Sequence, residues 1–169
     1  MKKGELKEIK GDTTDPVQMY DNEISIIPHV CNDENKFGAG FTFALNQKWK
    51  QPEQVYRKFC ENNKEIPILG KVCYAKISNH LVIANMIAQH STISKDNPVP
   101  IKYVALMNCM LKLVGYIEMI KCQTSNPVVI HAPKFGSQLS GGNFDFVLEL
   151  IREIWIEAGI NVVIYNYVK

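Results

Sequence analysis

The sequence of 169 residues lacks the features that mark several classes of protein. Arginine is scarce, because the 19 basic residues include only Arg57 and Arg152, and the lysines are scattered rather than gathered into a stripe. A surface that follows nucleic-acid phosphates is therefore not expected. The basic start, MKKGELKEIKGDTTD, has no apolar run of signal-peptide length, and we expect no segment to span a bilayer. These absences predict a cytoplasmic protein with no membrane or nucleic-acid partner.

Metal-binding spacings and paired cysteines are also missing. Neither CxxC nor HExxH occurs, so the sequence predicts no metal site and no cofactor. An odd number of widely spaced cysteines predicts reduced thiols. With 46% hydrophobic and 21% charged residues, the chain is suited to one domain spanning residues 1–169. The five cysteines are Cys31, Cys60, Cys73, Cys109 and Cys122.

Strand and helix patterns alternate along the chain. Six short apolar or β-branched runs predict strands: Leu6–Lys10, Ile24–Val30, Lys71–Ile77, Leu81–Ile87, Val128–Ala132 and Val162–Tyr167. Four stretches of helical periodicity lie between them: Gly40–Lys48, Pro52–Asn63, Ile101–Lys121 and Phe144–Ala158. A tight turn at Ser78–His80 predicts one antiparallel pair. The pattern predicts an α/β fold, with a mixed, mostly parallel six-stranded sheet between two helical layers.

Three residues mark the expected ends of helices. Asn143 can cap the last helix, and Gly159 follows that helix where a left-handed residue is usual. Pro100 suits the first turn of the long third helix.

Loops that follow strands are the places to look for function, because open α/β sheets bind ligands beyond the carboxyl ends of their strands. The first loop, Gly11–Pro16, carries Asp12, whose carboxylate could accept a hydrogen bond from an exocyclic amine. The alternative is a plain Asp-Pro turn in which the Asp side chain caps its own loop.

The second loop, His29–Gly40, combines polar side chains with small residues. Gly38, Ala39 and Gly40 allow a ligand to approach the backbone, although a dinucleotide fingerprint would need a third glycine. His29 ends a buried strand, which is compatible with a hydrogen-bonded structural histidine or with a catalytic one.

The third loop, Phe135–Phe144, is rich in glycine and serine and could turn its N–H groups toward a diphosphate. A flexible entry to the following helix is the alternative. Asn143 stands after Gly142 where a Walker loop needs lysine, so triphosphate hydrolysis by that route is disfavoured.

The three loops, in this order, resemble the macro domain family over essentially the whole chain. Gly11-Asp12-Thr13-Thr14 is similar to the family's opening GDIT segment, which implies that Asp12 binds the adenine amine, with Thr13 beside it. The resemblance implies further ligand contacts for Asn32 and the glycine run at the distal ribose, for Tyr165 at the adenine, and for the diphosphate loop Ser137, Gln138, Leu139, Ser140 and Gly141. Gln138 replaces a usual glycine.

Within the family, the chain most resembles the branch of ADP-ribose 1''-phosphate phosphatases and terminal ADP-ribose glycohydrolases. A histidine stands at the position of His29 in the phosphatases, which implies catalysis by His29 with Asn32 orienting the ribose. The catalytic lysine and aspartate of the glycohydrolase fall in segments that match Ile87-Ala88-Gln89-His90 and Leu139-Ser140 here, and both residues are missing, so a lysyl intermediate is not expected.

The resemblance therefore implies binding of ADP-ribose and hydrolysis of ADP-ribose 1''-phosphate without a metal. Two alternatives stay open: a non-catalytic reader of free or protein-linked ADP-ribose, and an esterase acting on O-acetyl-ADP-ribose or on ADP-ribosylated acidic residues. His90, beside Gln89, is a secondary catalytic candidate or a surface histidine.

Overall fold

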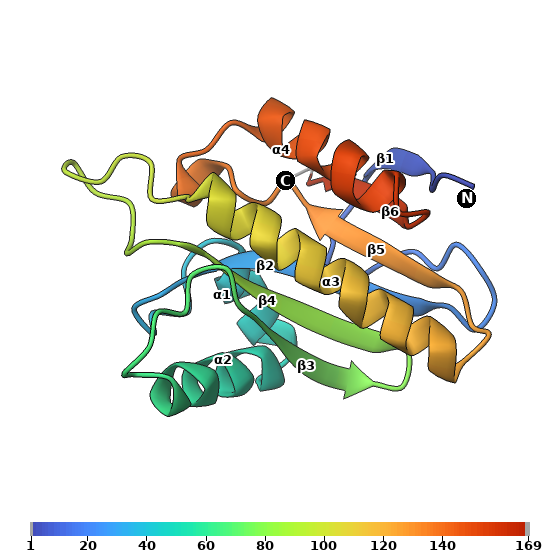
Figure 1. Cartoon of the computed structure of the whole chain (residues 1–169), viewed down its shortest axis with the longest axis horizontal. Helices are drawn as coiled ribbons and strands as arrows, with labels where there is room; N and C mark the ends of the chain where they lie inside the picture. The colour runs from blue at the N-terminus through green and yellow to red at the C-terminus, as the bar shows by residue number, and fades with distance from the viewer. Residues whose placement is uncertain (1, 168–169) are drawn as a thin grey trace.

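The centre of the molecule is one mixed sheet, shown in Figure 1 by a computed structural model that describes residues 2–167. Its six described strands lie in the order β1-β6-β5-β2-β4-β3. Strand β3 runs antiparallel to β4, and the other neighbours pair in parallel. Each strand lies within two residues of its predicted bounds: β1 Leu6–Lys10, β2 Ile24–Asn32, β3 Val72–Ser78, β4 Leu81–Gln89, β5 Val128–Pro133 and β6 Asn161–Asn166.

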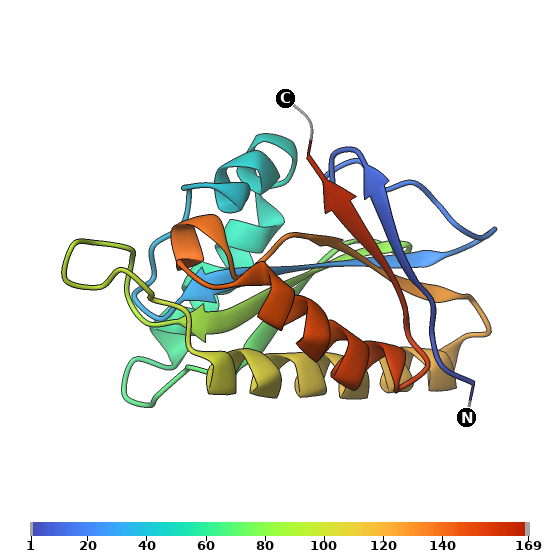
Figure 2. The same ribbon diagram turned by 90° about the horizontal axis from the view of Figure 1, so that it is seen from above.

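Helices cover both faces of this sheet. Helices α1 (Phe41–Lys48) and α2 (Gln51–Asn62) lie on one face, and α3 (Tyr103–Gln123) and α4 (Phe144–Leu150) lie on the other, as Figure 2 shows from above. Helix α4 continues into a π-helical segment, η2 (Ile151–Ile156). The predicted helix 144–158 is therefore present, but it changes from α-helical to π-helical after Leu150. The predicted three-layer α/β/α architecture is confirmed.

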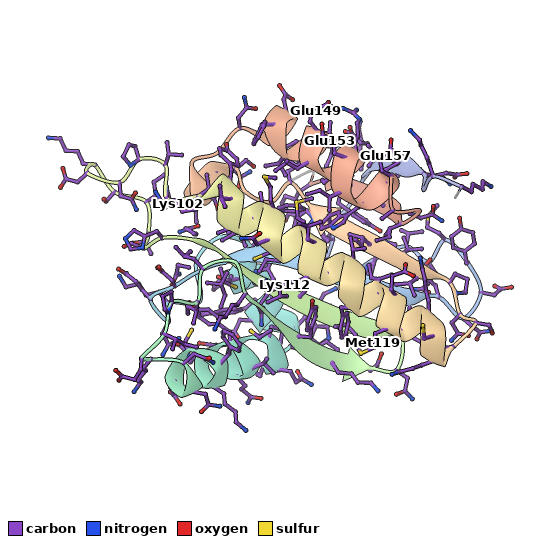
Figure 3. The ribbon with its side chains drawn as sticks, in the orientation of Figure 1. Lys102, Lys112, Met119, Glu149, Glu153 and Glu157 are labelled. Atoms are coloured by element: carbon purple, nitrogen blue, oxygen red, sulfur yellow. The ribbon has the colours of Figure 1, made fainter. Side chains whose placement is uncertain are left out.

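Helix α3 supplies much of the core. Leu106, Met110, Leu113 and Ile117 are fully buried and belong to the cluster that packs on the sheet. The opposite face of α3 carries Lys112 and the exposed Met119 (Figure 3). By length and composition alone, α3 is the one described helix that could cross a membrane, although the sequence was expected to hold no segment of this kind. Its buried stripe has the spacing of a helix packed on a core by one face.

The predicted helix ends are partly confirmed. Asn143 accepts a hydrogen bond from the Asp145 amide at 2.9 Å and caps α4. Gly159 has the expected positive φ of 77°. The prediction for Pro100 was wrong, because Ile101 forms an antiparallel bridge with Gln89 and the helix begins only at Tyr103.

Replacing the capping residue should destabilise the fold measurably. We expect Asn143→Ala to lower the free energy of unfolding by about 1 kcal/mol, because the Asp145 amide loses its acceptor. Urea denaturation followed by circular dichroism measures this change. Asn62→Ala, at the exposed end of α2, is the matched control and should change stability by less than about 0.5 kcal/mol. Equal effects of the two substitutions would contradict the capping role.

Candidate functional site

The predicted loops gather at one edge of the sheet. Strands β1, β2 and β5 belong to the parallel part of the sheet, so the loops that follow them leave from its carboxyl edge. Two of these loops touch, because a Cβ atom added to Gly40 would lie 2.8 Å from Cδ1 of Leu139. We call residues 11–16, 32–40 and 134–143 together the carboxyl-edge loops.

In the first loop, Asp12 caps its own turn, as the structural interpretation of this loop predicts. Its Oδ1 accepts hydrogen bonds from the amide and the hydroxyl of Thr14, each at 2.8 Å, which closes the turn. The residue is exposed, and its second carboxylate oxygen is left for a ligand. Thr13 is only 4% exposed, so its side chain has little surface to offer a ligand. Lys48 donates to the Thr14 carbonyl at 2.7 Å and ties this loop to α1.

The second loop is organised around Asn32. Its Oδ1 accepts from the amides of Glu34 and Lys36 at 3.0 and 3.2 Å and from the Tyr56 hydroxyl at 2.8 Å. Its Nδ2 donates to the Lys36 carbonyl at 2.7 Å. The Asn32 side chain, which was expected to orient the distal ribose, therefore uses its hydrogen bonds to hold the loop in shape.

Within the run Gly38–Gly40, the space beside Gly38 is open, whereas Leu139 packs against Gly40. Gly38 has a φ of 116°, and a Cβ added there would meet no atom within 4 Å. Gly40 precedes α1 with a φ of 60°, and no side chain caps this helix start. Backbone that a ligand can approach closely is what the sequence predicted for this run.

The third loop has a shape that requires glycine. Gly141 has a φ of 68°, and a Cβ there would lie 2.2 Å from the Pro98 carbonyl oxygen. Gln138 has a φ of 50°, a left-handed conformation that L side chains adopt at a cost. The backbone at Gln138 thus has the left-handed conformation that favours the glycine usual at this position. The Ser137 hydroxyl donates to the Lys134 carbonyl at 2.8 Å and closes the start of the loop.

The two segments that the resemblance matches to the glycohydrolase pair, Ile87–His90 and Leu139-Ser140, adjoin each other. The Ser140 hydroxyl donates to Oε1 of Gln89 at 3.0 Å, and both side chains are buried. The Gln89 amide also donates to the Ser91 carbonyl at 2.9 Å. A neutral, hydrogen-bonded pair thus joins the end of β4 to the third loop, with no amine for covalent catalysis.

The structure favours the structural alternative for His29. The side chain is 1% exposed, and its Nε2 donates to Oδ1 of Asn85 at 2.5 Å. The ring packs against Phe37 and Phe41, at centroid distances of 6.0 and 5.9 Å. Burial lowers the pKa of His29 to about 4, although the bond to Asn85 opposes the shift. A neutral, enclosed imidazole is badly placed to exchange protons with a substrate.

Nearby cysteines are equally inert. Cys31, Cys60, Cys73 and Cys109 are buried free thiols, as the predicted reduced state requires. Burial raises the pKa of Cys73 to about 11 and that of Cys31 well above the usual value for a thiol. Protonated thiols in such surroundings are poor nucleophiles.

Tyr165 does not lie where the resemblance implied. It is 2% exposed, and its hydroxyl accepts from the Val17 amide and pairs with Nδ1 of His131, each at 2.9 Å. His131 Nε2 donates to the buried Glu23 carboxylate at 2.6 Å. Burial raises the pKa of Glu23, but hydrogen bonds from His131, the Met19 amide and Ser25 outweigh it, so the pKa is lowered. The ring is part of a buried polar network, and Tyr167 is the exposed aromatic residue at this end of β6.

The sequence interpretation named His90 as a secondary catalytic candidate but did not foresee its pairing with Asp33. Asp33, after β2, and His90, after β4, lie with Oδ2 and Nδ1 2.8 Å apart. The sequence contained both residues, but their separation of 57 positions hid their contact.

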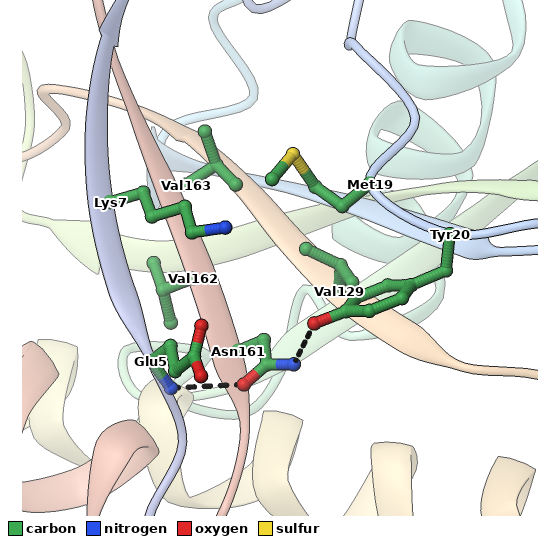
Figure 4. A pocket seen from close by; sticks show the side chains of 8 residues that line it. All are labelled: Glu5, Lys7, Met19, Tyr20, Val129, Asn161, Val162 and Val163. Carbon is green, nitrogen blue, oxygen red and sulfur yellow. Dashed lines mark hydrogen bonds between the residues drawn. The ribbon is translucent and has the colours of Figure 1, made fainter.

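A small hollow lies away from these loops. Glu5, Lys7, Tyr20 and Asn161 are among the residues that line it, near the amino-terminal ends of β1 and β6 (Figure 4). Its volume of about 10 Å³ is that of one water molecule, so it cannot hold a nucleotide.

Solved structures resemble the chain over nearly its whole length. A protein of unknown function from Bacteroides thetaiotaomicron is 32% identical, with a TM-score of 0.85 and coverage of 98% of this chain and 99% of that one. A macrodomain protein from Streptomyces coelicolor is 28% identical, with a TM-score of 0.78 and coverage of 96% and 99%. Thermosipho africanus DarTG, solved with ADP-ribose, is 13% identical, with a TM-score of 0.65 and coverage of 88% and 42%.

These similarities define the architecture. No model of a known protein family matches the sequence, and no curated protein matches it. The agreement with macrodomain structures is nevertheless close, and the chain has the macrodomain fold.

The buried His29 should make stability depend on pH. Its pKa is about 4 in the folded protein against 6.5 ordinarily, so its contribution is complete above about pH 6.5 and is lost as the pH falls toward 4. The loss amounts to about 3–4 kcal/mol at most, since one pKa unit corresponds to about 1.4 kcal/mol. Urea unfolding of wild type and His29→Gln from pH 7 to 4 should show a shallower decline for the variant. Parallel declines would refute this assignment, and His80→Gln, an exposed histidine, is the control.

Proposed function

We propose that the carboxyl-edge loops bind ADP-ribose. The contact between Gly40 and Leu139 carries the proposal, because it joins the two glycine-bearing loops that would hold the ribose and the diphosphate. The macrodomain fold supports it, as does the presence of ADP-ribose in the structurally similar DarTG. Backbone amides at such loops suit an anionic diphosphate without a cluster of cationic side chains.

Each part of the ligand has a proposed partner. Asp12 accepts from the adenine amine through its unused carboxylate oxygen. The Ser137–Gly141 segment holds the diphosphate, and Gly38–Gly40 lies beside the distal ribose, with Asn32 supporting the loop. Tyr165 packs beside the loop that carries Asp12, because its ring lies 3.4 Å from a Cβ position on Gly11, and so supports that loop without touching the ligand.

Asp12→Asn tests the adenine contact. Asparagine keeps one acceptor for the Thr14 turn but replaces the other oxygen with a donor, which opposes the amine. A lost hydrogen bond to a charged group costs about 1.5–3 kcal/mol, so calorimetric titration should show ADP-ribose binding weakened roughly 10- to 100-fold. Asp21→Asn, an exposed acid outside the carboxyl-edge loops, should bind like wild type. Unchanged affinity in Asp12→Asn would exclude this contact, and no binding by wild type would exclude the proposal.

Hydrolysis at the distal ribose is the finer proposal. The resemblance implies removal of a 1''-phosphate, but the burial of His29 takes away the acid–base group assigned to that reaction. The neutral Gln89–Ser140 pair supports a reaction without a lysyl intermediate. Proposed hydrolysis therefore relies on water activated by another residue or by the ligand.

The surroundings of Asn32 favour an uncharged ester over a phosphate dianion. The charged side chains around this loop are Asp33, Glu34, Lys36 and Arg57. Lys36 pairs with Glu34 at 2.6 Å, and Arg57, which donates to the Asn35 carbonyl, pairs with Glu53 at 2.7 Å. Carboxylates repel a phosphate dianion, whereas an acyl ester of the ribose carries no charge. An O-acyl ester of ADP-ribose is therefore the second candidate substrate. Parallel assays of phosphate release and of ester cleavage distinguish the two, and cleavage of neither would indicate a reader.

A further inference from the structure

The Asp33–His90 pair has the geometry of an oriented acid–base group. The Asp33 carboxylate is fixed at both oxygens, because Oδ1 accepts from the Ser91 amide at 2.9 Å and Oδ2 faces Nδ1 of His90 at 2.8 Å. The Asp33 side chain is 17% exposed and the His90 side chain is 60% exposed. The partly buried acid therefore anchors a ring whose other nitrogen is accessible.

The backbone holds this pair from several sides. The Asp33 amide donates to the Gln89 carbonyl at 3.0 Å, and the His90 amide donates to the Pro100 carbonyl at 2.9 Å. Asn97 donates to the His90 carbonyl at 2.9 Å. Ser91 has a φ of 58°, a left-handed conformation in a residue other than glycine. A conformation that costs free energy persists only where its surroundings impose it, and such positions are frequent at functional sites.

The pair also stands beside the groups proposed to meet the distal ribose. Asp33 follows Asn32, which shapes the loop leading to Gly38. His90 follows Gln89, whose side chain is bonded to Ser140 of the diphosphate loop. These links place the pair at the distal-ribose end of the proposed site.

We infer that His90, oriented by Asp33, is the acid–base catalyst that hydrolyses a carboxylic ester on the distal ribose of ADP-ribose. The inference rests on the proposed binding of ADP-ribose. Asp33 accepts the Nδ1–H bond, which fixes the tautomer and leaves a lone pair on the accessible Nε2. His90 is the catalytic residue and Asp33 is its positioning residue.

The reaction needs no reagent other than water. His90 Nε2 takes a proton from water while the water oxygen bonds to the acyl carbon, and the carbonyl electron pair moves to its oxygen. The tetrahedral intermediate then re-forms the C=O bond and breaks the bond from acyl carbon to ribose oxygen. The ribose oxygen takes the proton from His90, so the products are a carboxylic acid and ADP-ribose.

The first experiment compares wild type with His90→Ala on O-acetyl-ADP-ribose and on ADP-ribose itself. General acid–base catalysis contributes about 10²–10⁴-fold, so kcat for the ester should fall by at least about 100-fold. Binding of ADP-ribose, measured by calorimetry, should stay within about threefold, because His90 acts on the acyl group. Added imidazole should restore part of the rate in His90→Ala. His80→Ala, an exposed histidine at the β3–β4 turn, should keep the wild-type rate.

Asp33 requires a separate measurement, because its loss could act through the fold. Asp33→Ala should lower kcat about tenfold or more with KM unchanged, while Asp33→Asn, which keeps one acceptor, should recover part of that loss. A rise in KM with unchanged kcat in Asp33→Ala would overturn the positioning role.

The outcomes separate this inference from the proposed function. Ester cleavage at the wild-type rate by His90→Ala would overturn the inference, and so would a lost rate that imidazole cannot restore. Wild type that binds ADP-ribose but cleaves no ester would overturn it and leave the binding proposal intact. Wild type that fails to bind ADP-ribose would overturn the proposed function itself.

Discussion

The hydrogen bonds of Asn85 hold together the part of the molecule on which the carboxyl-edge loops depend. Asn85 lies fully buried in β4, between His29 on β2 and Cys73 on β3. Its Oδ1 accepts from His29, and its Nδ2 donates to the Pro52 carbonyl at 3.0 Å. One amide therefore satisfies the imidazole and fixes the start of α2 against the sheet. Leaving either partner unpaired in this interior would cost about 1–3 kcal/mol.

The shape of the second loop follows from that arrangement. His29, held by Asn85, packs against Phe37 and Phe41 on either side of the glycine run. Asn32 holds the loop from its other end, through Lys36 and Tyr56. The run Gly38–Gly40 lies between two braced ends. His29 and Asn32, which the sequence motif marks as catalytic, thus support the loop. The side chains proposed to meet a substrate are those of Asp33 and His90.

Much of the fold could be predicted because its signals are local. Strand runs are apolar, Asn143 and Gly159 act within one turn of their helix, and these predictions were confirmed. Pro100 was misjudged because a bridge between Ile101 and Gln89, distant in sequence, keeps that segment extended.

The site could be predicted only in outline. The positions of the loops follow from the order of the strands. Whether each side chain is free to contact a ligand depends on its burial and on hydrogen-bond partners distant in sequence. His29 and Tyr165 lie within largely apolar strands, and nothing in their own segments shows that they pair with Asn85 and His131. The pairs Gln89–Ser140 and Asp33–His90 join residues 51 and 57 positions apart, which no local pattern reveals.

The two pairs complement each other chemically. A lysine at the position of Gln89 would supply an amine for a covalent bond to the ribose, whereas a glutamine amide is not nucleophilic. The bond between Gln89 and Ser140 instead joins the end of β4 to the diphosphate loop, directly before His90. Without an amine at this position a covalent lysyl intermediate cannot form, and the proposed chemistry instead uses His90 to activate water. At this strand end the glutamine amide supports the diphosphate loop rather than acting as a nucleophile, and the proposed chemistry therefore lies at an ester attached to the ribose.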